Sequence, residues 1–258
     1  MPLEIKNLSF SYNKKNILND ITQSFEGHKV TSIIGPNGSG KTTLLKNISK
    51  QLKIEDKKIF LDSADINDMT IKNFSKNLSV VNQHNNITFN FTVRDIVLMG
   101  RTPHIKGIEN EKQADKEIAE KYLKLTGTYH LKDSYITQIS GGELQKVIIA
   151  RALTQETKYL LLDEPISMLD IKNEFEIMSL IKNLSVTENI TILIVLHDLN
   201  LAAQFSDNII LLSEGEIHKY GNPWEVITEK NISDVYGVNP KIVENPKTGK
   251  PHLIYYSV

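Results

Sequence analysis

The sequence predicts an α/β fold. Short runs of apolar and β-branched residues alternate with segments of helical periodicity, the pattern of a sheet with helices packed on it. One run, residues 30–34, stops at a glycine-rich loop that is followed by a helical segment at 41–49. Another run, residues 159–162, ends in two adjacent carboxylates, Asp163 and Glu164. Because ligands bind at the carboxyl ends of strands in open α/β sheets, both junctions are candidate sites.

Size and composition exclude several classes of protein. The 258 residues suit one elaborated α/β domain, and 40% hydrophobic with 24% charged residues suits a packed core with a solvated surface. A formal net charge of −1 gives no general attraction for nucleic acid or anionic lipid. With no cysteine, disulfides and thiolate metal sites are excluded. The N-terminus lacks a signal-peptide pattern, and the longest apolar run, residues 190–196, is far below the ~20 residues of a membrane-spanning helix.

The other elements continue the alternation. Further strands are predicted at residues 3–10, 21–25, 78–82 and 191–196, with a hairpin of strands 209–212 and 216–220 around Gly215. Further helices are predicted at 92–99, 111–125 and 140–154. The helix at 111–125 is highly charged, and its spacing favours a core-facing stripe of Ala114, Ile118, Tyr122 and Leu125. The tail from Asn222 has a weak pattern that predicts a short helix or two.

The glycine-rich loop fits a phosphate-binding motif. It comprises Gly35, Pro36, Asn37, Gly38, Ser39, Gly40, Lys41 and Thr42, which match G-x-x-x-x-G-K-[S/T] between a strand and a helix. Glycines let backbone N–H groups point into one concavity, and the helix start adds positive dipole. Lys41 should reach the β and γ phosphates, and Thr42 should offer its hydroxyl to Mg²⁺. The four fixed positions and the flanks favour this reading over an ordinary glycine-rich turn.

The acidic pair after residues 159–162 is a candidate catalytic and metal site. Asp163 is placed to hold Mg²⁺, directly or through water. Glu164 would be the general base, or would orient the attacking water. Taken alone, the pair could also be a helix N-cap or a solvated turn. The phosphate loop upstream favours the functional interpretation.

Residues 139–143 have the sequence Ile-Ser-Gly-Gly-Glu and precede a helix. Ser140 and Glu143 match an S-x-x-E capping box, which does not explain Gly141 and Gly142. Bare backbone at a helix N-terminus beside a serine suits an anion. Here the chain resembles ATP-binding-cassette (ABC) ATPases, whose signature is Leu-Ser-Gly-Gly-Gln with Arg-Ala-Leu further along the helix. This chain departs from it at Ile139 and Glu143, and it has Arg-Ala-Leu at 151–153.

The remaining motifs of that family fall in the same order. Tyr12 matches the aromatic residue that stacks on adenine, although a core aromatic remains the alternative. Gln83 matches the Q-loop glutamine, which approaches Mg²⁺ and the attacking water. Residues 167–170 match the D-loop, which crosses the dimer interface and ends in Asp170. His197 matches the switch histidine that contacts the γ-phosphate.

The resemblance covers residues 12 to 198 and implies a fold. It implies a P-loop NTPase core of the RecA-like type, with an N-terminal antiparallel β subdomain and an inserted α-helical subdomain. We expect one ABC ATPase domain over residues 1–258. The α/β core with its β subdomain would span 1–83 and 151–220, the helical subdomain 84–150, and a C-terminal extension 221–258.

The resemblance also implies cofactors and roles. ATP and Mg²⁺ are the expected cofactors. Glu164, His197, Gln83 and Lys41 are expected in catalysis, and Thr42, Gln83 and Asp163 at Mg²⁺. The expected nucleotide-binding residues are Tyr12, the loop from Gly35 to Thr42, Thr43, Ser140, Gly141, Gly142, Glu143 and Asp170.

The resemblance further implies partners and a location. One phosphate loop and one signature per chain predict a head-to-tail homodimer with two ATP molecules between the subunits. Transmembrane permease subunits would bind it at the cytoplasmic face of the cell membrane, and an extracytoplasmic substrate-binding protein would act indirectly. No nucleic acid is expected.

An alternative is a soluble cassette protein that acts on nucleic acid or ribosomes. Residues 84–150 are too short for the coiled coil of chromosome and repair members, and translation-associated members carry two cassettes. The neutral net charge also disfavours nucleic acid.

Segments 91–104, 196–204 and 245–251 resemble importers of iron–siderophore complexes, haem or cobalamin. Importers of molybdate, zinc or manganese remain an alternative. Arg101 and His104 are expected near the permease, or else as ordinary surface residues.

Overall fold

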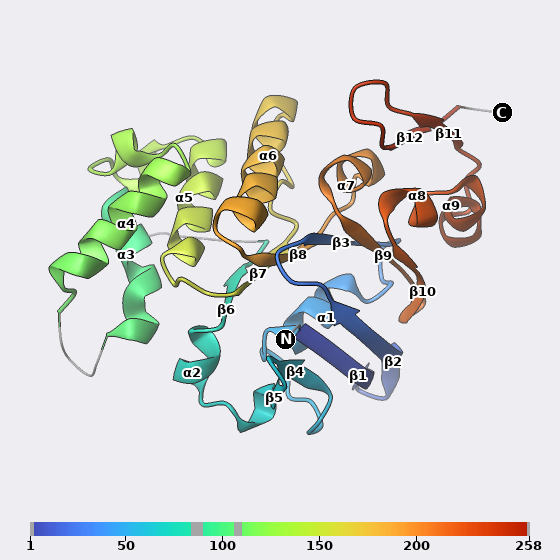
Figure 1. The fold of residues 1–258 in the computed structure, drawn as a ribbon, viewed down its shortest axis with the longest axis horizontal. Coiled ribbons are helices and arrows are strands. Elements are labelled where there is room, and N and C mark those ends of the chain that lie inside the picture. Colours follow the sequence, from blue (N-terminus) through green and yellow to red (C-terminus); the bar gives the residue numbers. More distant parts are fainter. Residues whose placement is uncertain (1–2, 84–89, 106–109, 257–258) are drawn as a thin grey trace. The chain divides into compact units, whose positions relative to one another are not determined.

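The computed structural model describes residues 3–83, 90–105 and 110–256, and it confirms the α/β class (Figure 1). The chain divides into two compact units. The first unit comprises Met1–Asp68 and Ile181–Val258, and the second comprises Met69–Leu180.

The first unit contains a mostly parallel group of strands. Its members are β3 (Val30–Ile34), β8 (Thr191–Val195), β9 (Asn208–Ser213) and β10 (Glu216–Gly221). Strand β3 lies between β8 and β9 and runs parallel to both, while β10 is antiparallel to β9. Every residue of β3 and β8 is buried. Strands covered on both faces have continuous apolar sequences, which explains why the sequence predicted these strands closely.

The first unit also contains an antiparallel sheet in the order β2-β1-β4-β5. Its strands are β1 (Leu3–Tyr12), β2 (Lys15–Phe25), β4 (Ile59–Leu61) and β5 (Ala64–Asp65). This sheet confirms the expected N-terminal β subdomain. Strand β2 begins earlier than predicted because Asn13 and Lys14 both have positive φ, 44° and 70°, and close a tight hairpin.

The helices of the first unit follow its strands. They are α1 (Lys41–Ile48) after β3, the 3-10 turn η1 (Ile66–Asp68), α7 (Leu199–Phe205) after β8, then α8 (Pro223–Val226) and α9 (Glu229–Tyr236). The chain closes with a hairpin of β11 (Lys241–Glu244) and β12 (Pro251–Ile254). Figure 1 shows this hairpin in red beside α7. The short tail helices were predicted, and the hairpin was not.

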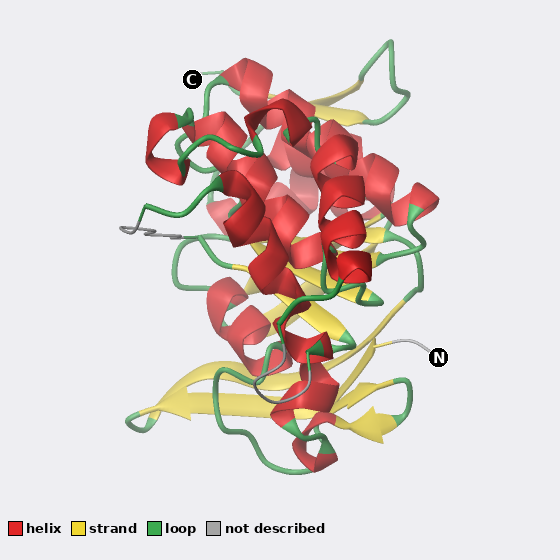
Figure 2. Ribbon diagram, turned by 90° about the vertical axis from the view of Figure 1, so that its left-hand side faces the viewer, coloured by secondary structure: helices red, strands yellow, loops and turns green. Residues whose placement is uncertain are grey.

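The second unit pairs two parallel strands with a group of helices. Strands β6 (Leu78–Val81) and β7 (Tyr159–Asp163) run side by side. Helices α3 (Val93–Leu98), α4 (Gln113–Leu125) and α5 (Gly141–Leu153) pack on one another (Figures 1 and 2). The other elements are α2 (Ile71–Ser75), α6 (Ile171–Thr187), which continues past the unit boundary, and the 3-10 turns η2 (Met99–His104), η3 (Tyr129–Leu131) and η4 (Ile136–Gln138).

The buried face of α4 differs from the predicted stripe. Asp115, Ala119, Tyr122 and Leu123 are buried, whereas Ala114 is exposed and Leu125 is 37% exposed. The prediction is confirmed at Tyr122 and wrong at Ala114 and Leu125, because it excluded charged residues from the buried face. The Asp115 carboxylate faces the interior because it forms an ion pair with a buried cation.

That cation is Arg101, which is only 6% exposed. Its Nε donates to Asp115 Oδ1 at 2.9 Å, and its Nη1 donates to Thr154 O at 2.6 Å and to Glu156 Oε2 at 2.8 Å. The hydrogen bond from Arg101 lowers the pKa of Asp115. Arg101 is therefore neither an ordinary surface residue nor exposed to a partner. Removing one member of such a buried pair leaves an uncompensated charge, which is costly.

Within the part of the chain that the structure describes, no helix has both the length and the apolar character that a bilayer crossing requires.

Candidate functional site

The phosphate loop of the first unit is folded around a lysine. Residues 35–40 connect β3 to α1, and Lys41 opens the helix with only 6% of its surface exposed. Lys41 Nζ donates to Gly35 O at 2.8 Å and to Pro36 O at 3.0 Å. The ammonium group is thus held on the inner side of the loop, where it can exchange carbonyl partners for phosphate oxygens.

The loop fits an anion in its backbone and its polar atoms. Gly35 has φ of 154°, and a Cβ there would overlap the carbonyl oxygen of Leu212 on β9, so glycine is required. Ser39 Oγ is buried and has no hydrogen-bond partner among the described residues. A buried hydroxyl without a partner is costly, and a phosphate oxygen would satisfy it.

The N-terminus of α1 reinforces that fit. Its N-cap is Gly40, and within the described structure no side chain caps it and its first turn carries no acidic residue. Thr42 and Thr43 are half-buried in that turn. The positive end of the helix dipole is therefore left for an anion.

The two other candidate residues of the first unit lie on its surface. Tyr12, the last residue of β1, is 42% exposed, and its ring meets Phe10 edge-on with centroids 4.9 Å apart. The alternative of a core aromatic is therefore wrong for Tyr12. His197 is exposed in the short link between β8 and α7.

In the second unit, the ends of two parallel strands bring three candidate residues together. Gln83 follows β6, while Asp163 closes β7 and Glu164 comes next. Gln83 Nε2 donates to Glu164 Oε2 at 2.6 Å. Glu164 has φ of 50°, a left-handed conformation that few non-glycine residues adopt. Such strain persists only where surrounding structure enforces it, and it concentrates at functional sites.

The oxygen donors present suit Mg²⁺ bound together with a nucleotide. In the second unit, Asp163 is 7% exposed and Gln83, after the neighbouring strand, carries an amide oxygen. Among the described residues, no cluster of three or more acidic or histidine side chains forms a metal cage. Mg²⁺ commonly binds one or two carboxylates plus substrate phosphates, so the oxygens of Asp163 and Gln83 suit an ion that is bound with a nucleotide.

The signature segment forms the predicted capping box. Ser140 N and Oγ both donate to Glu143 Oε2, at 2.8 and 2.7 Å, and Glu143 N donates back to Ser140 Oγ at 3.4 Å. These bonds, first that of the Ser140 hydroxyl, lower the pKa of Glu143. The carboxylate therefore stays charged beside the start of α5.

A residue that sequence reasoning missed connects the signature to the D-loop. Asn173 N and Nδ2 donate to the Asp170 carboxylate at 2.9 and 2.8 Å, and the backbone bond is the main cause that lowers the pKa of Asp170. A Cβ on Gly142 would overlap the Asn173 amide. Gly142 thus allows Asn173 to approach α5. An aspartate three residues before an asparagine at a helix start is the local signal that indicates this cap.

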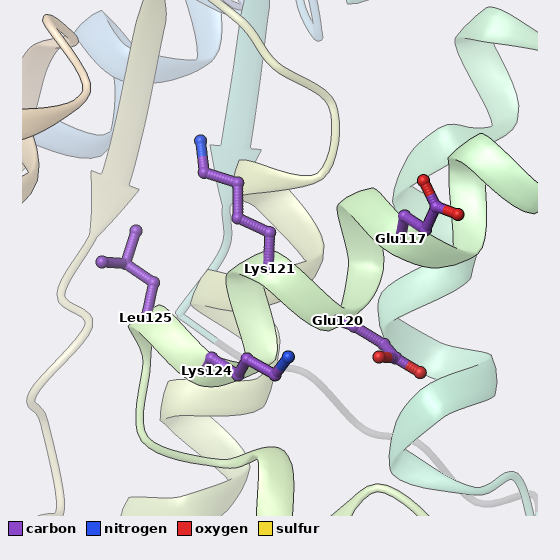
Figure 3. Close-up of a pocket in the computed structure, with 5 residues that line it drawn as sticks. All are labelled: Glu117, Glu120, Lys121, Lys124 and Leu125. Atoms are coloured by element: carbon purple, nitrogen blue, oxygen red, sulfur yellow. The ribbon is translucent and has the colours of Figure 1, made fainter.

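A surface pocket on α4 contains none of the candidate residues. It is lined by Glu117, Glu120, Lys121, Lys124 and Leu125, and Figure 3 shows these side chains along one helix. Two cations and two anions give this pocket no selective charge, and it suggests no chemistry.

The chain is similar to known proteins along most of its length. The family model for ABC transporters matches residues 18–167. An uncharacterized ABC transporter ATP-binding protein, MJ0089 of Methanocaldococcus jannaschii, is 44% identical over 94% of each chain. The iron(3+)-hydroxamate import ATP-binding protein FhuC of Bacillus subtilis is 35% identical, over 99% of this chain and 95% of FhuC. The hemin import ATP-binding protein HmuV of Aliivibrio fischeri is 36% identical, over 97% of this chain and 96% of HmuV.

Solved structures of ABC transporter cassettes are also similar to this chain. The dimeric structure of MJ0796, a bacterial ABC transporter cassette, matches with a TM-score of 0.73 and 27% identity, over 85% of this chain and 98% of that one. The same cassette in a post-hydrolysis state, bound to ADP and Pi, matches with a TM-score of 0.72. The chain belongs to the ABC transporter family, and it is an ATPase of that family.

Proposed function

We propose that this ATPase energises an importer of iron(III)–siderophore complexes. The supporting observation is similarity along nearly the whole chain to an iron(3+)-hydroxamate import protein, including the C-terminal extension. Similarity to a hemin import protein makes haem the second candidate cargo, and cobalamin is a third, from the sequence resemblance. The ATPase would work at the cytoplasmic face of the membrane, bound to permease subunits, with an extracytoplasmic substrate-binding protein delivering the cargo.

In this proposal the first unit holds the nucleotide. Tyr12 would stack on adenine, since half-exposed aromatic rings offer a flat apolar face. Backbone amides of residues 35–40 and the start of α1 would bind the phosphates, with Thr43 beside them. Lys41 would leave the carbonyls of Gly35 and Pro36 for the β and γ phosphates. His197 would contact the γ-phosphate.

Hydrolysis would depend on the pair of Gln83 and Glu164, whose 2.6 Å hydrogen bond is the observation that supports these roles. Gln83 would hold the Glu164 carboxylate in one orientation. Glu164 would accept a proton from the attacking water, or orient that water as it meets the γ-phosphate. Mg²⁺, when bound, supplies positive charge against the phosphates, and Thr42, Gln83 and Asp163 would hold it.

The signature and D-loop residues would act across a homodimer. Ser140, Gly141, Gly142, Glu143 and Asp170 would complete the ATP site of the other subunit. The dimeric form of the MJ0796 cassette supports this arrangement. ATP would then stabilise a closed dimer, and its hydrolysis would allow opening. Such a ligand can drive motion only through its different affinities for the two states.

Uptake in cells tests the import role. Labelled ferric siderophore, haem and cobalamin are offered to cells with and without this gene, and to deletion cells that express wild type or Glu164→Gln. We expect ferric siderophore uptake to disappear on deletion, to return with wild type and to stay absent with Glu164→Gln. Uptake of all three that is unchanged by deletion would contradict the proposed cargo, and molybdate, zinc and manganese would be tested next.

A further inference from the structure

The elements of the C-terminal extension are joined by hydrogen bonds that its weak sequence pattern does not indicate. Trp224 Nε1 on α8 donates to Gly249 O in the loop of the β11–β12 hairpin at 2.9 Å. Ile242 N on β11 donates to the Glu229 carboxylate on α9 at 3.3 Å. We call this unit, residues 222–256, the C-terminal brace.

The C-terminal brace is hydrogen-bonded to the helix that follows His197. Asn200 on α7 makes two hydrogen bonds with one residue of β12: its Nδ2 donates to Leu253 O at 3.2 Å, and Leu253 N donates to its Oδ1 at 2.7 Å. The side-chain amide thus pairs with main chain as another peptide group would. Leu253 is 2% exposed, so both bonds lie at a largely buried position, and β12 packs on α7 (Figure 1).

The two hydrogen bonds of Asn200 lie close to His197 in the sequence. Asp198 caps α7 by accepting from Leu201 N at 2.8 Å, and His197 immediately precedes that cap. Any rotation of α7 would therefore move the backbone of His197. On its other side, His197 is joined through Leu196 to β8, whose residues are all buried.

Two tyrosines of the brace interact with residues of the candidate phosphate loop and of the α7 cap. Burial raises the pKa of Tyr236 on α9, and a hydrogen bond from the Gly35 backbone partly opposes this rise. Burial and, to a lesser degree, the charge of Asp198 raise the pKa of Tyr255. Tyr236 is thus linked to the first residue of the phosphate loop, and Tyr255 lies within electrostatic range of the cap next to His197.

We propose that the C-terminal brace positions His197 for ATP hydrolysis, and that Asn200 is the positioning residue through which it acts. The side-chain amide of Asn200 is engaged by Leu253, so it would act through α7 and not on the reacting atoms. Its two bonds fix the start of α7, and thereby the place from which the imidazole approaches the γ-phosphate. The proposal rests on the role of His197 given above.

The first test needs no ATP. Hydrogen–deuterium exchange is compared over residues 197–205 in wild type, Asn200→Ala and Asn67→Ala. Asn67 is a matched control, because it is also half-buried in the first unit and its Nδ2 donates to a main-chain carbonyl, Ile54 O, at 3.2 Å. We expect faster exchange over 197–205 in Asn200→Ala alone. Equal exchange over residues 197–205 in the two variants would contradict the proposal that the brace holds α7 in place.

The second test separates positioning from general destabilisation. In Asn200→Ala we expect kcat for ATP hydrolysis to fall about tenfold, since two modest hydrogen bonds are lost, while ATP affinity stays within about twofold. Asn200→Asp keeps the 2.7 Å acceptor and should lose only about threefold. In a His197→Ala background, Asn200→Ala should cause no further loss. A full tenfold loss in that background would contradict action through His197. By contrast, wild-type turnover in His197→Ala would contradict the histidine's proposed role, a separate result.

Discussion

Two helix N-termini of this chain, those of α1 and α5, begin in opposite ways. Helix α1 starts at Gly40, where the described structure places no side-chain cap and no acidic residue in the first turn. Helix α5 starts at Ser140, which exchanges three hydrogen bonds with Glu143. Each lies at a glycine-containing motif, yet one N-terminus is open and the other is closed by the carboxylate of its own Glu143.

The difference between the N-termini of α1 and α5 indicates different roles in binding ATP. An open N-terminus beside Lys41 suits an anion that is bound within one chain. A closed N-terminus with a charged Glu143 repels an anion until the carboxylate moves or a second positive group arrives. The first site would therefore bind ATP in the monomer, and the second would contribute only when a dimer forms. The prediction for α1 concerns ATP affinity, and the prediction for α5 is smaller and concerns stability.

The largest effect is expected at α1. Lys41→Ala removes the only positively charged side chain of the phosphate motif, and we expect ATP affinity to fall about 100-fold. Fluorescent ATP titration measures it, with Lys46→Ala in the last turn of the same helix as the control. Wild-type affinity in Lys41→Ala would mean that the open N-terminus binds ATP without the lysine.

A smaller effect is expected at α5. The folded pKa of Glu143 is lowered, so its charge stabilises the fold at pH above the ordinary glutamate value. That stabilisation is lost as pH falls through the lower folded value. Glu143→Gln keeps a capping side chain and should cost less than about 1 kcal/mol near neutral pH, because the group is partly solvated. Urea unfolding at several pH values should show this difference shrink in acid; a constant difference would contradict the charged cap.

The sequence predicted the elements whose causes are local. Strands β3 and β8 are continuous apolar runs, and the phosphate loop is set by glycines at fixed spacing. It did not predict features that depend on distant partners. The burial of Asp115 depends on Arg101 from another element, and Asn200 on α7 hydrogen-bonds the β12 strand of the C-terminal hairpin.

The candidate site shows the same division. Gln83 and Glu164 were predicted separately, and the structure joins them by a hydrogen bond. Asn173 was missed because its contact with Gly142 is made by a distant segment of the chain. Motif spacing can identify residues that act on a ligand, but it does not show which neighbours hold those residues in place.

Glu164→Gln with saturating ATP and Mg²⁺ tests the central claim most directly. Size-exclusion chromatography with light scattering measures its mass, and phosphate release measures turnover, with the exposed-turn variant Glu214→Gln as control. The account predicts a stable ATP-dependent dimer and a loss of turnover of at least about 100-fold for Glu164→Gln. A monomer at saturating ATP, or turnover equal to wild type, would contradict it.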